Sequence, residues 1–288
     1  SSTFGAKVDE TFRRAGDRAT WKTTSDAGDQ AVSGPAMYMA LGGAPQGFSV
    51  ALQALAKRPD GKLPLLPNGT LTARELTRLT AQCSGKPREA RLMAVSGVGL
   101  TPNFGWVTAD NELFAFIVPG YLQMLEEGCK ADGPALEEAQ KRAEAALLVD
   151  IAKRHAKPLP GSTLIRNARV FDSERAQLGA ASDVLVRDGR IVSVAPTGGT
   201  VAADRVLEAA GRVLLPGLFD MHTHTGRWEG PLNIASGVTT VRDMGNDNAN
   251  IRQMRQEIAA GSLLGPDIVA AGFIEGESEF ASRSDYVV

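Results

Sequence analysis

The sequence predicts a mixed α/β protein, because three kinds of pattern follow one another along the chain. The first ~120 residues alternate apolar and polar side chains between turns, as in an α+β domain built on an antiparallel sheet. From Ser162, short strands are joined by tight turns such as Asp188-Gly189, which is typical of a small β-sandwich. After Pro216, apolar strands alternate with helices, as in parallel sheets. We expect an N-terminal α+β antiparallel-sheet domain over 1–130, a helical linker over 131–160, β-sandwich strands over 161–213 and a parallel α/β part over 214–288.

The expected N-terminal domain contains one helix among strands. Alternation on both sides of Ala15-Gly16-Asp17 predicts a hairpin with arms from Phe4 to Val8 and from Ala19 to Thr23. The remaining elements are a helix over 47–58, a loop over 63–67, strands over 71–80 and 88–96, and a hairpin of 106–108 with 113–118. A binding or carrier role, with an apolar ligand or partner held against this sheet, is the alternative function for the domain.

A long helix is expected over 134–155, with Asp132 or Gly133 as its cap and prolines beyond its end. Its apolar stripe comprises Leu136, Ala143, Leu147 and Ile151. Later strands are expected over 164–171, 183–187, 190–194, 206–209 and 212–215, the last two paired with each other. The parallel part adds strands over 237–243 and 267–272 and a helix over 249–260.

Composition and charge narrow the classes of partner. The chain has 288 residues, 43% of them hydrophobic and 22% charged, which is ordinary for a globular protein. Its net charge is −2 without a strongly basic stretch, so nothing favours a nucleic acid partner. No run approaches the ~20 apolar residues that a membrane span needs.

Two features leave the location undetermined. The chain begins Ser1-Ser2-Thr3-Phe4, without Met and without the pattern of a signal peptide, so we expect the native N-terminus upstream. Cytoplasmic and exported locations are both compatible with this start. The two cysteines, Cys83 and Cys129, fit one disulfide or two free thiols equally well.

Two histidines form the strongest candidate site. The segment from Leu214 to His224 is an apolar strand that ends in His222-Thr223-His224. Side chains two apart on a strand point the same way, so both imidazoles can reach one metal ion at ~2.0–2.1 Å. Only three histidines occur in the chain, and two of them form this pair. We expect His222 and His224 to be metal ligands, against the alternative of a histidine pair on a solvated loop.

Residues 162–288 resemble the amidohydrolase superfamily. The similarity lies in Pro216-Gly217-Leu218-Phe219-Asp220-Met221-His222-Thr223-His224, after the strands of 164–215. The segment Gly237-Val238-Thr239-Thr240-Val241-Arg242-Asp243 resembles the second strand of the imidazolonepropionase-like and prolidase-like branch. The resemblance implies the start of a (β/α)8 TIM-type barrel beside a β-sandwich. It also implies hydrolysis of amide, cyclic amide or peptide-like C–N bonds by water activated on one or two divalent metal ions, Zn²⁺ foremost, with a small-molecule or peptide-like substrate.

The same resemblance predicts a fragment. The family pattern adds a lysine, two histidines and a late aspartate, yet no lysine or histidine follows His224. Residues 216–288 are far fewer than the ~250 of a whole barrel. We therefore expect a chain that is inactive alone and poorly soluble or dependent on a partner, because part of a barrel exposes apolar faces and strand edges.

Several other residues have two interpretations each. Asp243 is either a partner of a ligand histidine or the cap of a loop. Arg227, Trp228 and Glu229 either line a substrate mouth or lie on plain surface. The acidic run from Glu275 to Glu279 is a functional barrel loop or a solvated one. His155 is interpreted as structural.

Overall fold

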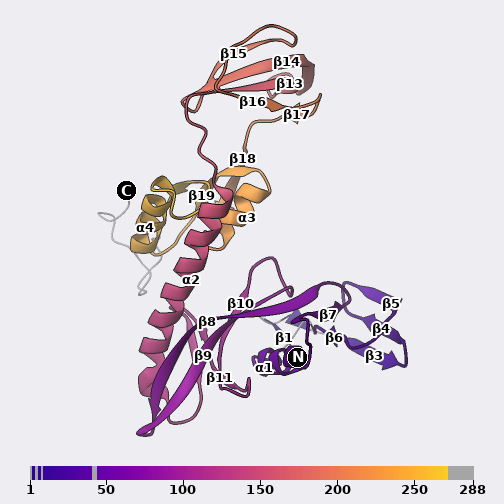
Figure 1. Ribbon diagram of the computed structural model, residues 1–288, viewed down its shortest axis with the longest axis vertical. Coiled ribbons are helices and arrows are strands. Elements are labelled where there is room, and N and C mark those ends of the chain that lie inside the picture. Colours follow the sequence, from indigo (N-terminus) through magenta and orange to yellow (C-terminus); the bar gives the residue numbers. More distant parts are fainter. Residues whose placement is uncertain (1, 4–5, 8, 41–43, 272–288) are drawn as a thin grey trace. The chain divides into compact units, whose positions relative to one another are not determined.

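The computed structural model describes residues 2–3, 6–7, 9–40 and 44–271 (Figure 1). The chain divides into two compact units. The N-terminal unit is Ser1–Ala146 and the C-terminal unit is Leu147–Val288. The boundary falls inside helix α2 (Gly133–His155), so each unit contains part of this helix. Within the described ranges, no helix is long and apolar enough to cross a membrane. The four-part division expected from the sequence stays a prediction.

A seven-stranded sheet forms the centre of the N-terminal unit, in the order β12-β11-β10-β9-β8-β7-β6. Its neighbouring strands are antiparallel except β6 and β7, which are parallel. The strands are β6 (Met37–Tyr38), β7 (Leu63–Leu66), β8 (Thr70–Cys83), β9 (Lys86–Ser96), β10 (Asn103–Val107), β11 (Leu113–Val118) and β12 (Leu122–Leu125). Smaller sheets pair β1 (Ser2–Thr3) with β2 (Ala6–Lys7) and join β3 (Thr11–Ala15), β4 (Arg18–Lys22) and β5 (Ala27–Ala31).

Helices cover both faces of the large sheet. Successive side chains of a strand point to opposite faces of the sheet, and those of β9 therefore pack in two different cores. Ala90 and Leu92 pack in the same core as Leu136 of α2. Met93 and Val95 pack in a second core with Leu52 of α1 (Gln46–Ala56). The unit is therefore a three-layer arrangement of helix, sheet and helix.

Most expected elements of this unit are confirmed. The helix at 47–58, the strands at 71–80 and 88–96 and the hairpin after residue 105 all form. The early hairpin turns at Gly16, but its first arm is Thr11–Ala15; Phe4 and Val8 lie outside the described residues. The loop expected at 63–67 is wrong, because Leu63–Leu66 forms β7 between β6 and β8. Burial of its leucines against α1 outweighs the prolines.

Helix α2 follows the prediction closely, with two differences in detail. A short 3₁₀ turn, η1 (Lys130–Asp132), precedes it. Asp132 does not cap the helix, because its Oδ1 accepts the N–H of Gln82 at 3.0 Å. Toward the C-terminal end the buried leucine is Leu148, whereas Leu147 is only half-buried.

The first strands of the C-terminal unit form one mixed sheet. Its order is β15-β14-β13-β16, and β17 also pairs with β13. The strands are β13 (Ser162–Asp172), β14 (Gln177–Arg187), β15 (Arg190–Pro196), β16 (Arg205–Glu208) and β17 (Val213–Leu214). Residues 162–214 build one hydrogen-bonded sheet, and the β-sandwich expected over 161–213 stays a prediction.

The expected pairing of 206–209 with 212–215 is wrong. Strands β16 and β17 both run parallel to β13 and follow one another along it. The turn between them binds to β13 itself, since Ala209 N–H donates to Arg166 O at 2.8 Å and Gly211 N–H to Asn167 O at 2.7 Å. These bonds extend the chain along β13, so the two segments cannot fold back onto each other.

A parallel sheet of the order β18-β19-β20 completes the description. Its strands are β18 (Leu218–Thr223), β19 (Val238–Asp243) and β20 (Asp267–Ala270), connected by α3 (Glu229–Ala235) and α4 (Asn248–Ala259). Val241 and Ile268 pack against Ile251 and Met254 of α4. The expected alternation of strand and helix is confirmed, while a closed barrel is not shown by these strands.

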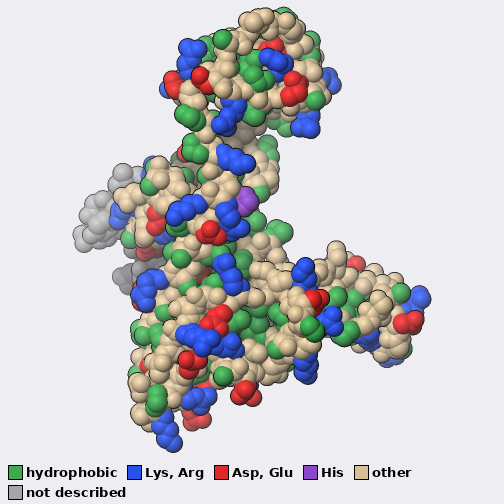
Figure 2. Space-filling model, viewed as in Figure 1, with side chains coloured by type: hydrophobic (Ala, Val, Ile, Leu, Met, Phe, Trp, Pro, Cys, Tyr) green, Lys and Arg blue, Asp and Glu red, His purple; other side chains and the backbone are tan. Residues whose placement is uncertain are grey.

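Large apolar side chains remain exposed on strands of the C-terminal unit. The exposed fraction is 67% for Ile191 of β15, 65% for Phe219 of β18 and 57% for Val269 of β20. Figure 2 shows hydrophobic side chains at the surface between charged ones. Parallel strands are usually covered on both faces, so the exposure of Phe219 and Val269 is unusual for the parallel sheet of β18, β19 and β20. The dependence of this chain on a partner stays a prediction.

Candidate metal site

The structure brings the two predicted ligands together at the end of β18. His222 lies in the strand and His224 directly follows it. Their ring centroids are 5.7 Å apart and the ring planes make an angle of 74°. Both side chains are exposed. The pair therefore lies at the carboxyl end of a parallel strand, the edge at which parallel barrels carry their active sites.

The local backbone departs from regular strand geometry at this point. The register with β19 shifts between Asp220 and Thr223, the latter being opposite Asp243. The N–H of His222 donates to Oδ1 of Asp220 at 3.0 Å. Such a break in register redirects side chains at the end of a strand, as β-bulges do beside active sites.

One ring nitrogen of His224 takes part in a hydrogen bond. Its Nδ1 lies 2.8 Å from the carbonyl oxygen of Gly245. A carbonyl oxygen can only accept a hydrogen bond, so Nδ1 is the atom that carries the proton. In the neutral imidazole the lone pair is then on Nε2, which is the atom free to bind a metal.

Asp243 caps the loops beside the histidines. It is completely buried at the end of β19. Its Oδ2 accepts the N–H of Thr225 at 2.7 Å, and its Oδ1 accepts the N–H of Gly245 at 3.0 Å. Oδ2 also accepts a longer bond, 3.3 Å, from Nδ2 of Asn246. Its bonds to backbone N–H groups favour the loop-cap interpretation over direct contact with a histidine ring.

The residues after the histidines contribute to packing. The guanidinium of Arg227 binds the Glu257 carboxylate of α4 through two nitrogens, one of them Nη2 at 3.3 Å from Oε1. Trp228 packs against the core that includes Val241. Glu229 begins α3. These contacts favour a structural role for the segment over a substrate mouth.

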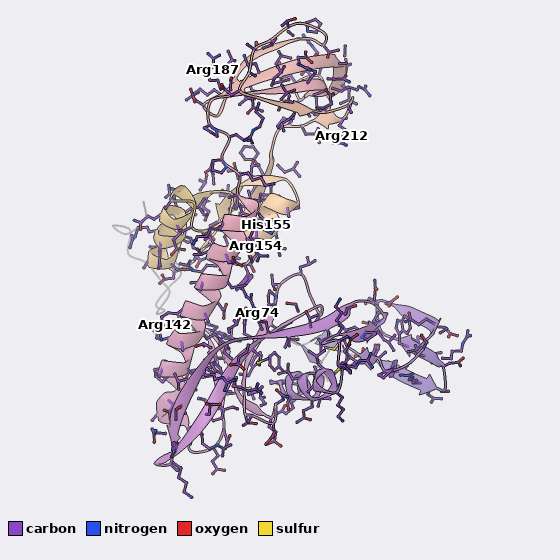
Figure 3. The ribbon with its side chains drawn as sticks, in the orientation of Figure 1. Arg74, Arg142, Arg154, His155, Arg187 and Arg212 are labelled. Atoms are coloured by element: carbon purple, nitrogen blue, oxygen red, sulfur yellow. A yellow bond between two sulfur atoms is a disulfide. The ribbon has the colours of Figure 1, made fainter. Side chains whose placement is uncertain are left out.

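Of the remaining candidates, His155 does not join the pair in a metal-binding group, and the acidic run lies outside the described residues. His155 is the last residue of α2, where Figure 3 labels it beside Arg154. The acidic run from Glu275 to Glu279 lies outside the described residues. In the described part of the chain, no group of three or more His, Cys, Asp or Glu side chains gathers as a metal site. Within that part of the chain, the candidate site thus consists of two imidazoles.

Sequence reasoning missed the role of Gly245. Its backbone carbonyl oxygen accepts a hydrogen bond from the His224 ring. A contact made by a backbone atom cannot be predicted from the type of side chain. A signal was present, however, in Asp243-Met244-Gly245-Asn246, which places turn-forming residues directly after a buried strand. Parallel neighbours end at the same edge, so this turn had to lie near the end of the histidine strand.

Comparison with known proteins finds relatives over part of the chain. No protein-family model matches. The chain is 42% identical over 62 residues to a dihydroorotase of Syntrophus aciditrophicus, covering 21% of this chain and 14% of that protein. It is 34% identical over 110 residues to an imidazolonepropionase of Salmonella typhimurium, covering 34% and 27%. It is 45% identical over 64 residues to a 5-methylthioadenosine/S-adenosylhomocysteine deaminase of Desulforudis audaxviator, covering 21% and 14%.

The chain spans about a quarter or less of the length of these curated relatives. Solved structures that resemble it include a prolidase candidate from Bifidobacterium longum, with 28% identity, a TM-score of 0.38 and coverage of 43% of this chain and 34% of that one. Phenylurea hydrolase B gives 26% identity, a TM-score of 0.34 and coverage of 40% and 31%. The names of the curated relatives point to the amidohydrolase superfamily, which confirms the resemblance found in the sequence.

Proposed function

We propose that this chain carries the first part of the active site of a metal-dependent amidohydrolase. The reaction is hydrolysis of a C–N bond in an amide, cyclic amide or peptide-like small molecule. The observation that carries the proposal is the pair His222 and His224, whose rings lie 5.7 Å apart at the carboxyl end of a parallel strand. Relatives named imidazolonepropionase, dihydroorotase and deaminase support it. The proposed architecture is the start of a (β/α)8 barrel.

The two imidazoles suit a divalent metal, with Zn²⁺ as the first candidate. Both are exposed, and His224 keeps Nε2 free because Nδ1 is held by a carbonyl oxygen. When bound, such a metal lowers the pKa of water to about 7 and polarises the scissile carbonyl group. The two imidazoles would supply the metal with nitrogen ligands, and the carbonyl oxygen of Gly245 orients the ring of His224. Catalytic zinc sites usually have three protein ligands, so we expect two imidazoles to bind weakly.

The test is a calorimetric titration of the chain with Zn²⁺. We expect His222→Ala and His224→Ala each to weaken binding by more than about tenfold, because each removes a direct ligand. His155→Ala is the matched control, since His155 is exposed at the end of α2 and is expected to leave binding unchanged. Equal loss in the His155 variant, or full binding without His222 and His224, contradicts the proposal.

The alternative role as an apolar carrier receives no support from the structure. That role requires a free apolar face on the N-terminal sheet. One face packs against α2 and the other against α1, as the two cores around β9 show. We therefore propose that the N-terminal unit is not a carrier that binds through its sheet.

A further inference from the structure

We propose that Asp243 is a positioning residue for His224 and acts through the backbone of Gly245. Its buried carboxylate fixes the loop whose carbonyl group selects the tautomer and the orientation of the His224 ring. The role of the His224 ring as a metal ligand rests on the proposed function. The hydrogen bonds that orient the ring do not depend on that proposal.

The Asp243 carboxylate connects the two segments that surround the ring. On one side it accepts the N–H of Thr225, the residue that follows His224, at 2.7 Å. On the other side it accepts the N–H of Gly245, at 3.0 Å, and the carbonyl of this same residue accepts the Nδ1 proton of His224, at 2.8 Å. A single side chain therefore sets the distance between the histidine backbone and the acceptor of its ring.

Further bonds make this arrangement stiff. Met244 N–H donates to Thr223 O at 2.9 Å, which continues the strand pairing past β18. Nδ2 of Asn246 donates to Thr225 O, also at 2.9 Å. Gly245 has a φ of +154°, in the region that favours glycine, so the direction of its carbonyl depends on a residue without a Cβ. The Asp243 side chain is not accessible to solvent, so bulk water cannot take the place of its hydrogen-bond donors. Both of its carboxylate oxygens accept a hydrogen bond.

The consequence for His224 is chemical. A neutral imidazole can carry its proton on either nitrogen, and only the form protonated at Nδ1 presents a lone pair at Nε2. The carbonyl oxygen of Gly245, fixed in place by Asp243, favours the form protonated at Nδ1 and restricts rotation of the ring. Partners of this kind around metal-binding histidines typically affect metal affinity by about 10- to 100-fold when they are removed.

The experiment reads the tautomer directly in the metal-free full chain. Long-range ¹H–¹⁵N NMR of ¹⁵N-histidine-labelled protein at about pH 8, where imidazole is neutral, distinguishes the two protonated nitrogens. We expect His224 to be protonated at Nδ1 in the unmodified chain. In Asp243→Asn an amide group replaces one acceptor oxygen, so the loop loses a bond and His224 shows a mixture of tautomers. Zn²⁺ affinity falls by about 10- to 100-fold in the same variant.

Asp247→Asn is the matched control. Asp247 is the N-cap of α4, where its Oδ1 accepts the N–H of Asn250 at 2.7 Å. It is close in sequence, and its capping bond lies outside the Asp243 network. We expect this variant to keep the Nδ1 tautomer and the Zn²⁺ affinity. If Asp243→Asn fails to fold by circular dichroism, Gly245→Ala displaces the carbonyl while Asp243 is retained, and the same mixture of tautomers is expected.

The outcomes separate the two proposals. A His224 ring without the Nδ1 proton in the unmodified chain overturns the positioning role whatever the metal affinity. So does an unchanged tautomer in folded Asp243→Asn or, if that variant does not fold, in Gly245→Ala. The predicted tautomers without any Zn²⁺ binding support the positioning role, and in that case the metal-dependent function fails instead.

Discussion

At the scale of single residues, Tyr38 shows how burial changes a side chain. Its hydroxyl donates to Oε1 of Glu10, and its ring stacks on Phe12 with the centroids 4.3 Å apart. Burial, followed by the hydrogen bond to Glu10, raises the pKa of Tyr38 to about 12. The protonated phenol is thus favoured in the folded state. Its contribution to stability is complete below pH 10 and is lost as the pH rises from 10 through about 12.

Replacement of Tyr38 by Phe tests this directly. An alkaline titration followed by tyrosinate absorbance is expected to lose a component near pH 12, because the variant lacks this phenol. The stacked ring remains, so the free energy of unfolding at neutral pH falls by only about 1 kcal/mol, the value of one hydrogen bond. Titration curves of the two proteins that coincide throughout would refute the assigned environment.

At the scale of elements, a disulfide decides how β8 and α2 are connected. Cys83, the last residue of β8, is bonded to Cys129, just before the turn that leads into α2. The two Cα atoms are 4.2 Å apart, and both side chains lie in the core between the sheet and the helix. The sequence was equally compatible with one disulfide and with two free thiols. The fold brings the two cysteines together as a disulfide.

Reduction of this bond is expected to destabilise the N-terminal unit. For a sequence separation of 46 residues, the chain-entropy model gives a loss of about 4 kcal/mol in the free energy of unfolding. Urea unfolding with and without a reductant measures the difference. The double variant Cys83→Ser with Cys129→Ser is the control and must not respond to the reductant. Two titratable thiols in the untreated native protein would contradict the bond.

At the scale of the whole molecule, stabilised carboxylates occur in both units. A hydrogen bond from Arg78 lowers the pKa of Glu75, and one from Lys141 lowers that of Glu137. In the C-terminal unit, the pKa values of Asp183 and Asp204 are lowered first by the backbone N–H groups of Asn167 and Ser162 respectively. A lowered pKa means that the unfolded chain binds protons more readily, so acid favours unfolding.

The melting temperature is therefore expected to fall in acid. These four groups contribute fully above their ordinary pKa values of 4.5 for Glu and 3.8 for Asp, and the contribution is lost as the pH falls through the lower folded values. Circular dichroism melts between neutral pH and about pH 2.5 measure this. Asp204→Asn should weaken the pH dependence, because it removes one of the titrating groups. A melting temperature that is constant over the whole range would contradict the expectation.

The sequence by itself determined the features that depend on local order. The helix at 133–155, the hairpin turn at 109–111 and the alternation of strand and helix after residue 216 all follow from periodicity and turn chemistry. The His222 and His224 pair belongs with them, because a spacing of two residues at the end of a strand already places both rings close together.

Only the tertiary structure decided the features that depend on distant residues. Pairing of β16 and β17 with β13, inclusion of β7 in the large sheet and the bond between Cys83 and Cys129 each join segments that no local pattern links. The same holds at the candidate site, where the backbone carbonyl of Gly245, in the loop after β19, contacts His224. Backbone atoms are alike in every residue, so a contact made by them becomes visible only when the strands are in register.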